Sequence, residues 1–329
     1  MSEMVKTQEE SQKKKKLISV VIPTYNEQEN VQAMTDTVVK IMTEQLPQYD
    51  YEILYIDNHS KDDTRGILRQ ICAENPHVKA IFNARNFGQM RSPVYGLKQA
   101  YGDCVIRLNA DFQDPPELIP EFVKKWESGY KIVLGIKNKT EEGKFMAWVR
   151  RCYYKLLRKI TEIGHIENFT GFSLLDKAFV DVVRQIHDPM PYLRGMIAEF
   201  GFDYDIVYYN RPNRRAGKSK NNFYSLYDVA MVGITSYSKV VLRMATFVGF
   251  GIAGISAIFG IVYLILKLIF WDMFKAGMAP MLIGMFFLGA VQIIFIGLLG
   301  EYILSINTRV LDRPLVVEEE RLNFTEEEK

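Results

Sequence analysis

Short apolar runs alternate with amphipathic segments through the first half of the chain. Apolar, β-branched runs of strand length occur at 17–22, 51–56, 78–82, 104–108 and 131–136. Segments with apolar residues at helical spacing lie between them, at 30–42, from 62 or 63 to about 74, from 89 to 100, and at 118–127. Such an alternation with short loops predicts an α/β domain built on a doubly wound, mostly parallel sheet.

Polar residues follow the predicted strands at the points where the strands end. These residues are Tyr25 and Glu27, Asp57, Arg85 and Asp111, in chain order. Because ligands of open α/β sheets bind outside the carboxyl ends of the strands, we expect these side chains to share one crevice. The chain has neither a GxGxxG nor a GxxxxGK[ST] motif, so a nucleotide would be held by side chains and isolated backbone groups.

Asp111 stands in residues 107–117 (RLNADFQDPPE), between a predicted strand and a predicted helix. A carboxylate there, with Gln113 two residues later, suits a hard divalent cation that also holds a diphosphate. A solvated loop whose acid caps a helix fits the spacing equally well. Features elsewhere in the chain are needed to choose between a metal site and a helix-capping acid.

Composition is that of a globular protein, with 48% hydrophobic and 24% charged residues, and the net charge of +2 does not indicate nucleic-acid binding. Cys72, Cys104 and Cys152 have no metal-like spacing and are expected to be reduced core thiols. Residues 1–16 are polar and end in four lysines, and we expect a flexible basic tail. No signal peptide is predicted, because Pro23 interrupts the apolar run that follows.

Two uncharged apolar stretches lie near the C-terminus, with 23 residues between Arg243 and Lys267 and 25 between Lys275 and Glu301. Each exceeds the roughly 20 residues needed to span a bilayer as a helix. We therefore predict a transmembrane hairpin over 243–304, with spans at about 244–266 and 278–300; the length of the stretches disfavours a buried soluble helix pair. Residues 211–243 carry seven Lys or Arg against one Asp, which places the large domain and both termini in the cytosol.

Two basic segments precede the first apolar stretch. Residues 145–163 have the pattern of a basic amphipathic helix, which fits either a domain surface or an anionic membrane surface. Residues 211–220 (RPNRRAGKSK) carry five cations and suit phosphate oxygens. The predicted organisation is a sheet domain over 17–224, a juxtamembrane amphipathic helix over 225–242, the hairpin, and a tail over 305–329. The charged residues 318–329 of that tail are expected to be disordered.

Several motifs occur together and in order over residues 17–317. They are VIPTYNE at 21–27, Asp57 with Ser60 and Asp62, RNFG at 85–88, ADFQDPPE at 110–117, Arg194-Gly195, the cationic loop, and GEY at 300–302. In these motifs the chain resembles the polyprenyl-phosphate glycosyltransferases of glycosyltransferase family 2. The resemblance implies a GT-A fold, a nucleotide-sugar donor, Mg²⁺ or Mn²⁺, and a polyprenyl phosphate acceptor at the cytosolic face of a bacterial inner membrane. It also implies a homo-oligomer, for which a tetramer is one form.

Family roles carry over by position. The resemblance assigns nucleotide binding to Pro23, Tyr25, Glu27, Asp57, Arg85 and Ala110. It assigns metal binding to Asp111 and Gln113, and acceptor or phosphate contacts to Arg194, Arg211, Arg214, Ser219 and Lys220. Catalysis would rest on Asp111, Gln113, Arg211, Arg214 and Lys220.

The chain departs from the family pattern at two places. Asn109 stands where an aspartate is usual, and Gly171-Phe172-Ser173 stands where many relatives have Asp-Phe-Arg, so an acid often given a catalytic role is missing. A phosphate monoester, whose second pKa is about 6, is already largely dianionic at neutral pH and needs no general base.

The expected reaction is inverting transfer of a sugar to undecaprenyl phosphate, with UDP-glucose, a UDP-N-acetylhexosamine and GDP-mannose all open as donors. A processive polysaccharide synthase is a second hypothesis, although more spans and a Gln-x-x-Arg-Trp motif would be expected. A non-catalytic membrane scaffold of the same fold is a third.

Overall fold

The computed structural model describes residues 15–138, 166, 168–212, 231–232, 240–270 and 278–325. Eight strands of this part form one sheet in the order β7-β5-β6-β4-β1-β2-β3-β8. Their bounds are β1 Leu17–Thr24, β2 Asp50–Asp57, β3 Val78–Asn83, β4 Cys104–Arg107, β5 Ile132–Lys137, β6 Phe169–Asp176, β7 Tyr204–Tyr209 and β8 Glu318–Leu322.

The centre of the sheet is parallel. Strand β1 pairs in parallel with both β2 and β4, and β2 pairs in parallel with β3. Strand β6 then runs antiparallel between β4 and β5, and β5 pairs in parallel with β7. The prediction of an α/β fold with a mostly parallel sheet is confirmed, with a mixed half beyond β4 that the sequence pattern did not show.

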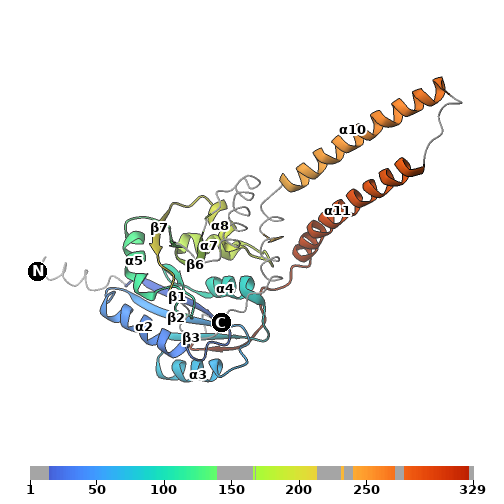
Figure 1. Ribbon diagram of the computed structural model, residues 1–329. Coiled ribbons are helices and arrows are strands. Elements are labelled where there is room, and N and C mark those ends of the chain that lie inside the picture. Colours follow the sequence, from blue (N-terminus) through green and yellow to red (C-terminus); the bar gives the residue numbers. More distant parts are fainter. Residues whose placement is uncertain are drawn as a thin grey trace, which may run out of the picture. The chain divides into compact units, whose positions relative to one another are not determined.

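Helices cover both faces of this sheet. Their bounds are α2 Val31–Glu44, α3 Thr64–Glu74, α4 Gly88–Gln99, α5 Ile119–Glu127, α7 Lys177–Gln185 and α8 Leu193–Glu199, and a short 3₁₀ turn, Pro116–Leu118, precedes α5. The apolar stripes of α2, α3 and α5 pack into one core with one face of the sheet. Those of α4, α7 and α8 pack into a second core on the other face. Figure 1 shows β1, β2 and β3 between α4 and the pair α2 and α3.

The end of the chain corrects one prediction. Residues 318–329 were expected to be disordered, but Glu318–Leu322 forms β8, which pairs antiparallel with β3 at the edge of the sheet. Asn323 fixes the end of this strand by donating its side-chain amide to the carbonyl oxygens of Cys72 and Val78, at 2.6 and 2.8 Å. Val316 is buried. Backbone pairing and these anchors hold a segment whose charged sequence alone predicts no packing.

Two long apolar helices belong to a second compact unit, which includes residues 222–311. They are α10, Val240–Ile269, and α11, Met278–Val310. Within them, Leu242–Tyr263 and Gly284–Val310 are long and apolar enough to cross a membrane, with mean hydropathies of 2.1 and 2.0. Large apolar side chains such as Phe247, Phe259 and Phe286 are more than 70% exposed, as lipid-facing residues would be. Both predicted spans fall within these helices.

Several predicted segments lie outside the described residues. They are nearly all of the basic tail 1–16, the amphipathic segment 145–163, the cationic loop from residue 213 onward, and most of the predicted juxtamembrane helix 225–242. Of the cysteines, Cys72 and Cys104 are free and buried, as expected, and Cys152 is outside the described part.

Candidate active site at the carboxyl edge of the sheet

The carboxyl ends of β4, β1, β2 and β3 lie along one edge of the sheet. Thr24 at the end of β1 is in register with Asp57 at the end of β2, and Asp57 is in register with Phe82 of β3. Val21 of β1 is in register with Arg107, the last residue of β4. The polar residues that follow these strands are therefore neighbours, as the pattern predicted.

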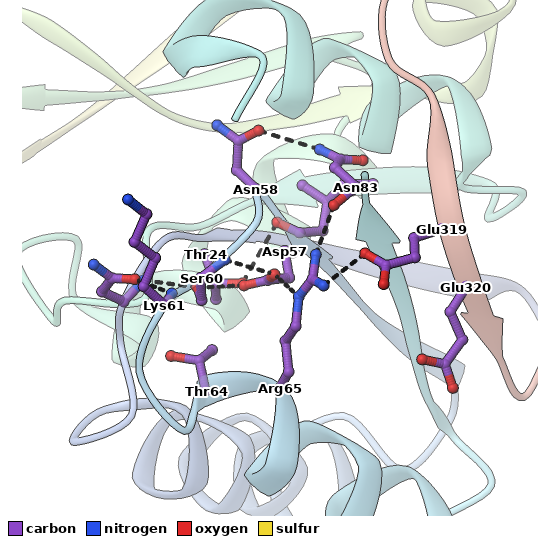
Figure 2. A network of polar contacts seen from close by, with 12 residues as sticks. Thr24, Asp57, Asn58, Ser60, Lys61, Thr64, Arg65, Asn83, Glu319 and Glu320 are labelled. Atoms are coloured by element: carbon purple, nitrogen blue, oxygen red, sulfur yellow. Dashed lines mark hydrogen bonds and ion pairs between the residues drawn. The ribbon is translucent and has the colours of Figure 1, made fainter. Parts of the chain in front are cut away.

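Asp57 is the centre of a polar network at this edge (Figure 2). It is fully buried, and its Oδ2 accepts hydrogen bonds from the Ser60 backbone N–H at 3.0 Å and from Arg65 Nε at 2.6 Å. Its Oδ1 accepts a hydrogen bond from the Ser60 hydroxyl. Three donors therefore hold the carboxylate in one orientation, and a nucleotide that contacts Asp57 would meet a preorganised group.

Arg65 links this network to the C-terminal strand. Its Nη2 donates to the carbonyl of Asn83 at 2.6 Å, and its Nη1 forms an ion pair with Glu319 of β8 at 2.8 Å. Figure 2 shows Glu319 reaching Arg65 from the β8 ribbon. Sequence reasoning missed Arg65, because it lies inside an amphipathic helix, where an arginine is usually a solvated residue.

The loops after β1 and β2 are bonded to each other. The Asn26 N–H donates to the Ser60 hydroxyl at 2.7 Å, and the Glu27 N–H donates to the Thr64 hydroxyl at 2.9 Å. In return, the Lys61 N–H donates to Asn26 Oδ1 at 2.7 Å. These bonds place the half-buried Tyr25 and Glu27 beside the Asp57 network.

The segment after β4 brings two carboxylates close together. Asp111 is 5% exposed and accepts a hydrogen bond from the Gln113 N–H at 3.1 Å. Asp114 is fully buried, and its Oδ2 accepts a hydrogen bond from the Asn109 side-chain amide at 2.5 Å. An aspartate at position 109 would face Asp114 as a like charge, so the amide of Asn109 fits this neighbour.

Neutral donors from β6 and β7 complete the surroundings of Asp114. Tyr209 donates its hydroxyl to Asp114 Oδ1 at 2.7 Å, and Thr170 donates to the same oxygen at 3.2 Å. Burial raises the pKa of Asp114, although the Tyr209 hydrogen bond and the charge of Arg211 oppose that rise. Tyr209 was not among the predicted site residues, and nothing in its sequence context distinguishes it from the other tyrosines of the strand.

The two predicted metal ligands, Asp111 and Gln113, offer only oxygen atoms to a metal ion. Among the described residues, no group of three or more His, Cys, Asp or Glu side chains could hold a metal by itself. The carboxylate of Asp111 and the amide oxygen of Gln113 suit Mg²⁺ or Mn²⁺, ions that commonly bind one or two carboxylates and take their remaining ligands from substrate phosphates and water. The residues fit a divalent ion that arrives with a diphosphate.

The other predicted site residues take varied positions. Pro23 is half-buried at the end of β1, and Arg85 is exposed with its guanidinium 4.4 Å from the centre of the Phe87 ring. Ala110 packs its methyl group into the core, so it can meet a ligand only through its backbone. Arg194 and Arg211 are half-buried, and Arg211 lies close enough to Asp114 to influence its charge. Arg214, Ser219 and Lys220 lie outside the described residues.

Comparison with known proteins gives a family match. The family described as Glycosyl transferase family 2 matches residues 19–183. The SfII prophage-derived bactoprenol glucosyl transferase of Shigella flexneri is 35% identical over 298 residues, which cover 90% of this chain and 96% of that protein. A prophage bactoprenol glucosyl transferase homolog of Escherichia coli (strain K12) is 34% identical over 287 residues, covering 87% of this chain and 93% of that protein.

Among solved structures, that of mannosyl-3-phosphoglycerate synthase from Rubrobacter xylanophilus has a TM-score of 0.47 and 17% identity to this chain. The match covers 74% of this chain and 77% of that protein.

Proposed function

We propose that this chain, which belongs to glycosyl transferase family 2 and is a glycosyltransferase, transfers a sugar from a nucleotide-diphosphate sugar to a polyprenyl phosphate. The observation that carries this proposal is the extent of the match to bactoprenol glucosyl transferases. An alignment of 298 residues in a chain of 329 has to include most of the apolar C-terminal part as well as the sheet domain. The likeness to those relatives therefore extends over the apolar C-terminal part as well as the sheet domain, which supports a lipid acceptor.

In the proposed reaction, an oxygen of the lipid phosphate attacks the anomeric carbon of the donor sugar. The bond from that carbon to the diphosphate oxygen breaks, and the nucleoside diphosphate leaves with the electron pair. One displacement inverts the anomeric configuration. The attacking phosphate is dianionic at neutral pH, since its second pKa is about 6, so Gly171 in place of an acid removes no group that this reaction needs.

Residues of this chain would position the diphosphate of the donor and the phosphate of the lipid. Asp111 and Gln113 would hold Mg²⁺ or Mn²⁺, which neutralises charge on the leaving diphosphate. Pro23, Tyr25, Glu27, Asp57, Arg85 and the Ala110 backbone are proposed to surround the nucleotide. Arg194, Arg211, Arg214, Ser219 and Lys220 are proposed to contact phosphate oxygens, where charge-assisted bonds act both in binding and in the transition state.

For location, we propose a multi-pass protein of the bacterial inner membrane, with residues 17–224 and both termini in the cytosol. α10 and α11 would supply the membrane hairpin, and association through these helices would give a homo-oligomer. Glucose is the first sugar to test, because the named relatives are glucosyl transferases.

The test is transfer by the full-length protein in detergent with Mg²⁺ or Mn²⁺. Radiolabelled UDP-glucose, UDP-N-acetylglucosamine and GDP-mannose are each offered with undecaprenyl phosphate, and in parallel with undecaprenol, which lacks the phosphate. We expect label in the lipid fraction with one donor and with the phosphate form only. Absence of lipid label with every donor, or equal labelling of undecaprenol, would refute the proposal.

A further inference from the structure

Arg107 and Gly171 face each other across β4 and β6, next to the candidate site. Arg107 is the last residue of β4 and is in register with Ser173, two residues after Gly171. A Cβ atom on Gly171 would lie 2.0 Å from Arg107 Nη1, which is far inside contact distance. The guanidinium of Arg107 therefore occupies the space that a side chain at position 171 would fill.

Arg107 has no anionic partner in the described part of the chain. No described carboxylate lies within ion-pair distance of its guanidinium, and its Nε is buried without a hydrogen-bond partner. Asp114, a buried acid whose charge acts on Arg107, already accepts hydrogen bonds from Asn109, Thr170 and Tyr209. A half-buried guanidinium costs free energy when its donors are not satisfied, so its presence calls for a function.

Two more arginines lie near Arg107 or near Asp114. Arg107 is close enough to both Asp114 and Arg194 for their charges to act on it, and Arg211 acts on Asp114. The guanidinium of Arg194 lies 6.0 Å from the centre of the Phe169 ring on β6. Burial lowers the pKa of Arg107 to about 10, so its guanidinium keeps its charge at neutral pH. We call Arg107, Arg194 and Arg211 the arginine cluster.

Among the described residues of this region, positive charges outnumber negative ones. The arginine cluster contributes three positive charges against the two carboxylates of Asp111 and Asp114, and a divalent ion at Asp111 would widen the excess. Guanidinium groups that repel one another are stabilised when an anion binds between them. Phosphate is the anion that fits best, because the planar fork of an arginine can bond two of its oxygens at once.

We propose that Arg107, in the space left open by Gly171, binds a phosphate group of a substrate. This inference rests on the proposed function, which brings two phosphate sources to this edge: the diphosphate of the donor and the phosphate monoester of the lipid. The chemistry of recognition is the same for both. Because Gly171 has no side chain, the guanidinium of Arg107, on the neighbouring strand β4, can occupy this space.

The test compares Arg107→Met, Arg107→Lys and Gly171→Ala in the full-length protein in detergent. One arm measures the affinity for UDP and for GDP with Mn²⁺ by calorimetry, without lipid. The other measures KM for farnesyl phosphate, a short polyprenyl phosphate, with the donor that the wild type uses. Arg184→Met is the matched control, because Arg184 is also half-buried but bonds the carbonyls of Lys98 and Ala100, before the start of β4.

We expect Arg107→Met to weaken one of the two interactions by about ten- to a hundredfold, which corresponds to one lost charge-assisted hydrogen bond. Arg107→Lys should recover part of the loss, and Gly171→Ala should resemble Arg107→Met. Weaker nucleotide binding identifies the donor diphosphate as the ligand, and a raised KM for farnesyl phosphate identifies the acceptor.

Stability gives an independent readout. Because the Nε of Arg107 is buried and unsatisfied, Arg107→Met should not lower the melting temperature, whereas Arg184→Met should lower it and leave both phosphate interactions unchanged. If the wild type transfers sugar while Arg107→Met keeps both its nucleotide affinity and its KM, the inference is wrong and the proposed function stands. If the wild type itself transfers no sugar to any polyprenyl phosphate, the proposed function fails instead.

Discussion

At the residue scale, Arg65 contacts two carboxylates that differ in their exposure to solvent. The Asp57 side chain is fully buried, and the Glu319 side chain is 52% exposed. Ion pairs at a surface contribute little to stability because water competes with them. A buried carboxylate that loses its cation pays a large desolvation cost. The two halves of one network should therefore respond very differently to mutation.

We predict that Arg65→Met lowers the free energy of unfolding by about 3–5 kcal/mol, because it leaves the buried Asp57 without its cation. Glu319→Gln, the matched change on the exposed side, should have little effect. Thermal unfolding in detergent, followed by circular dichroism, compares the two variants. Equal melting temperatures for both would show that the buried Asp57 carboxylate does not depend on Arg65 for its stability.

Asp111 supplies a second prediction at this scale. We expect Asp111→Ala to reduce sugar transfer by at least about a hundredfold, since a divalent ion at a leaving diphosphate contributes several kcal/mol. The variant should remain folded, and Asp36→Ala, which removes an exposed acid on α2, should transfer sugar at the wild-type rate. Initial rates with saturating Mg²⁺ measure the difference. Wild-type turnover by folded Asp111→Ala would exclude it from metal binding.

At the element scale, β8 covers β3, so that the sheet ends in a charged edge strand instead of an apolar one. An unpaired edge strand exposes a row of backbone donors and acceptors that can pair with other chains. We predict that a chain ending after Val310, which lacks β8 and the buried Val316, is recovered mostly as aggregate. A chain that lacks only residues 326–329 is the control and should behave as the wild type. Size-exclusion chromatography measures the monodisperse fraction; equal fractions for the two truncations would show that β8 is dispensable.

Helix α7 supplies a prediction about pH. Asp176 is its N-cap and accepts hydrogen bonds from the Ala178 N–H and the Trp126 indole N–H, at 2.9 and 2.7 Å. Burial raises the pKa of Asp176, but these bonds and Lys131 outweigh that effect, so its pKa lies below the ordinary value. A carboxyl whose pKa is depressed by folding stabilises the protein above its unfolded pKa, and this contribution is lost as the pH falls through the folded value.

We therefore expect Asp176→Asn to lower the free energy of unfolding by about 1 kcal/mol at pH 7. The difference from the wild type should begin to shrink as the pH falls below about 4, the ordinary pKa of an aspartate, and it should keep shrinking toward the lower pKa that Asp176 has in the folded protein. Melting temperatures of both proteins between pH 3 and 7 test this. A difference that stays constant over the whole range would assign the effect to packing instead of charge.

At the scale of the whole molecule, the two long apolar helices α10 and α11 lie, along the sequence, between two parts of one folded unit. Residues up to 149, residues 165–221 and residues from 312 onward belong to the same unit. A folded unit lies on one side of a bilayer, so the chain between these two parts has to cross it an even number of times. An even number of crossings favours a hairpin over a single span, without reference to the lysine and arginine bias.

We predict that Lys275→Cys, between the two helices, reacts with a membrane-impermeant maleimide added to intact cells, and that Lys329→Cys reacts only after the cells are opened. Cys72 and Cys104 are buried and should give no background, and Cys152 is replaced by serine in both variants. Labelling of Lys329→Cys in intact cells would overturn the proposed topology.

The sequence predicted most of the sheet, because buried parallel strands and amphipathic helices leave strong periodic patterns. It also predicted that Asp57 and Asp111 would lie at one edge, since the ends of parallel strands meet there. It did not predict β8, whose residues EEERL carry the charges typical of an edge strand and whose partner β3 is more than two hundred residues away. Arg65 and Arg107 were missed for a related reason: their contacts depend on register between distant segments, and no local pattern encodes that register.

The position of β8 also has a consequence for how the enzyme is made. Strand β3 leaves the ribosome long before β8, by on the order of ten to fifty seconds at about 5–20 residues per second. Both apolar helices are synthesised during that interval. Until β8 follows them, β3 has no partner on its outer side and Arg65 lacks its ion pair with Glu319. The last strand, β8, can be added only after both apolar helices have been synthesised. The sheet is therefore completed only when the chain has been made as far as β8, and until then the edge of β3 stays exposed to chaperones and proteases.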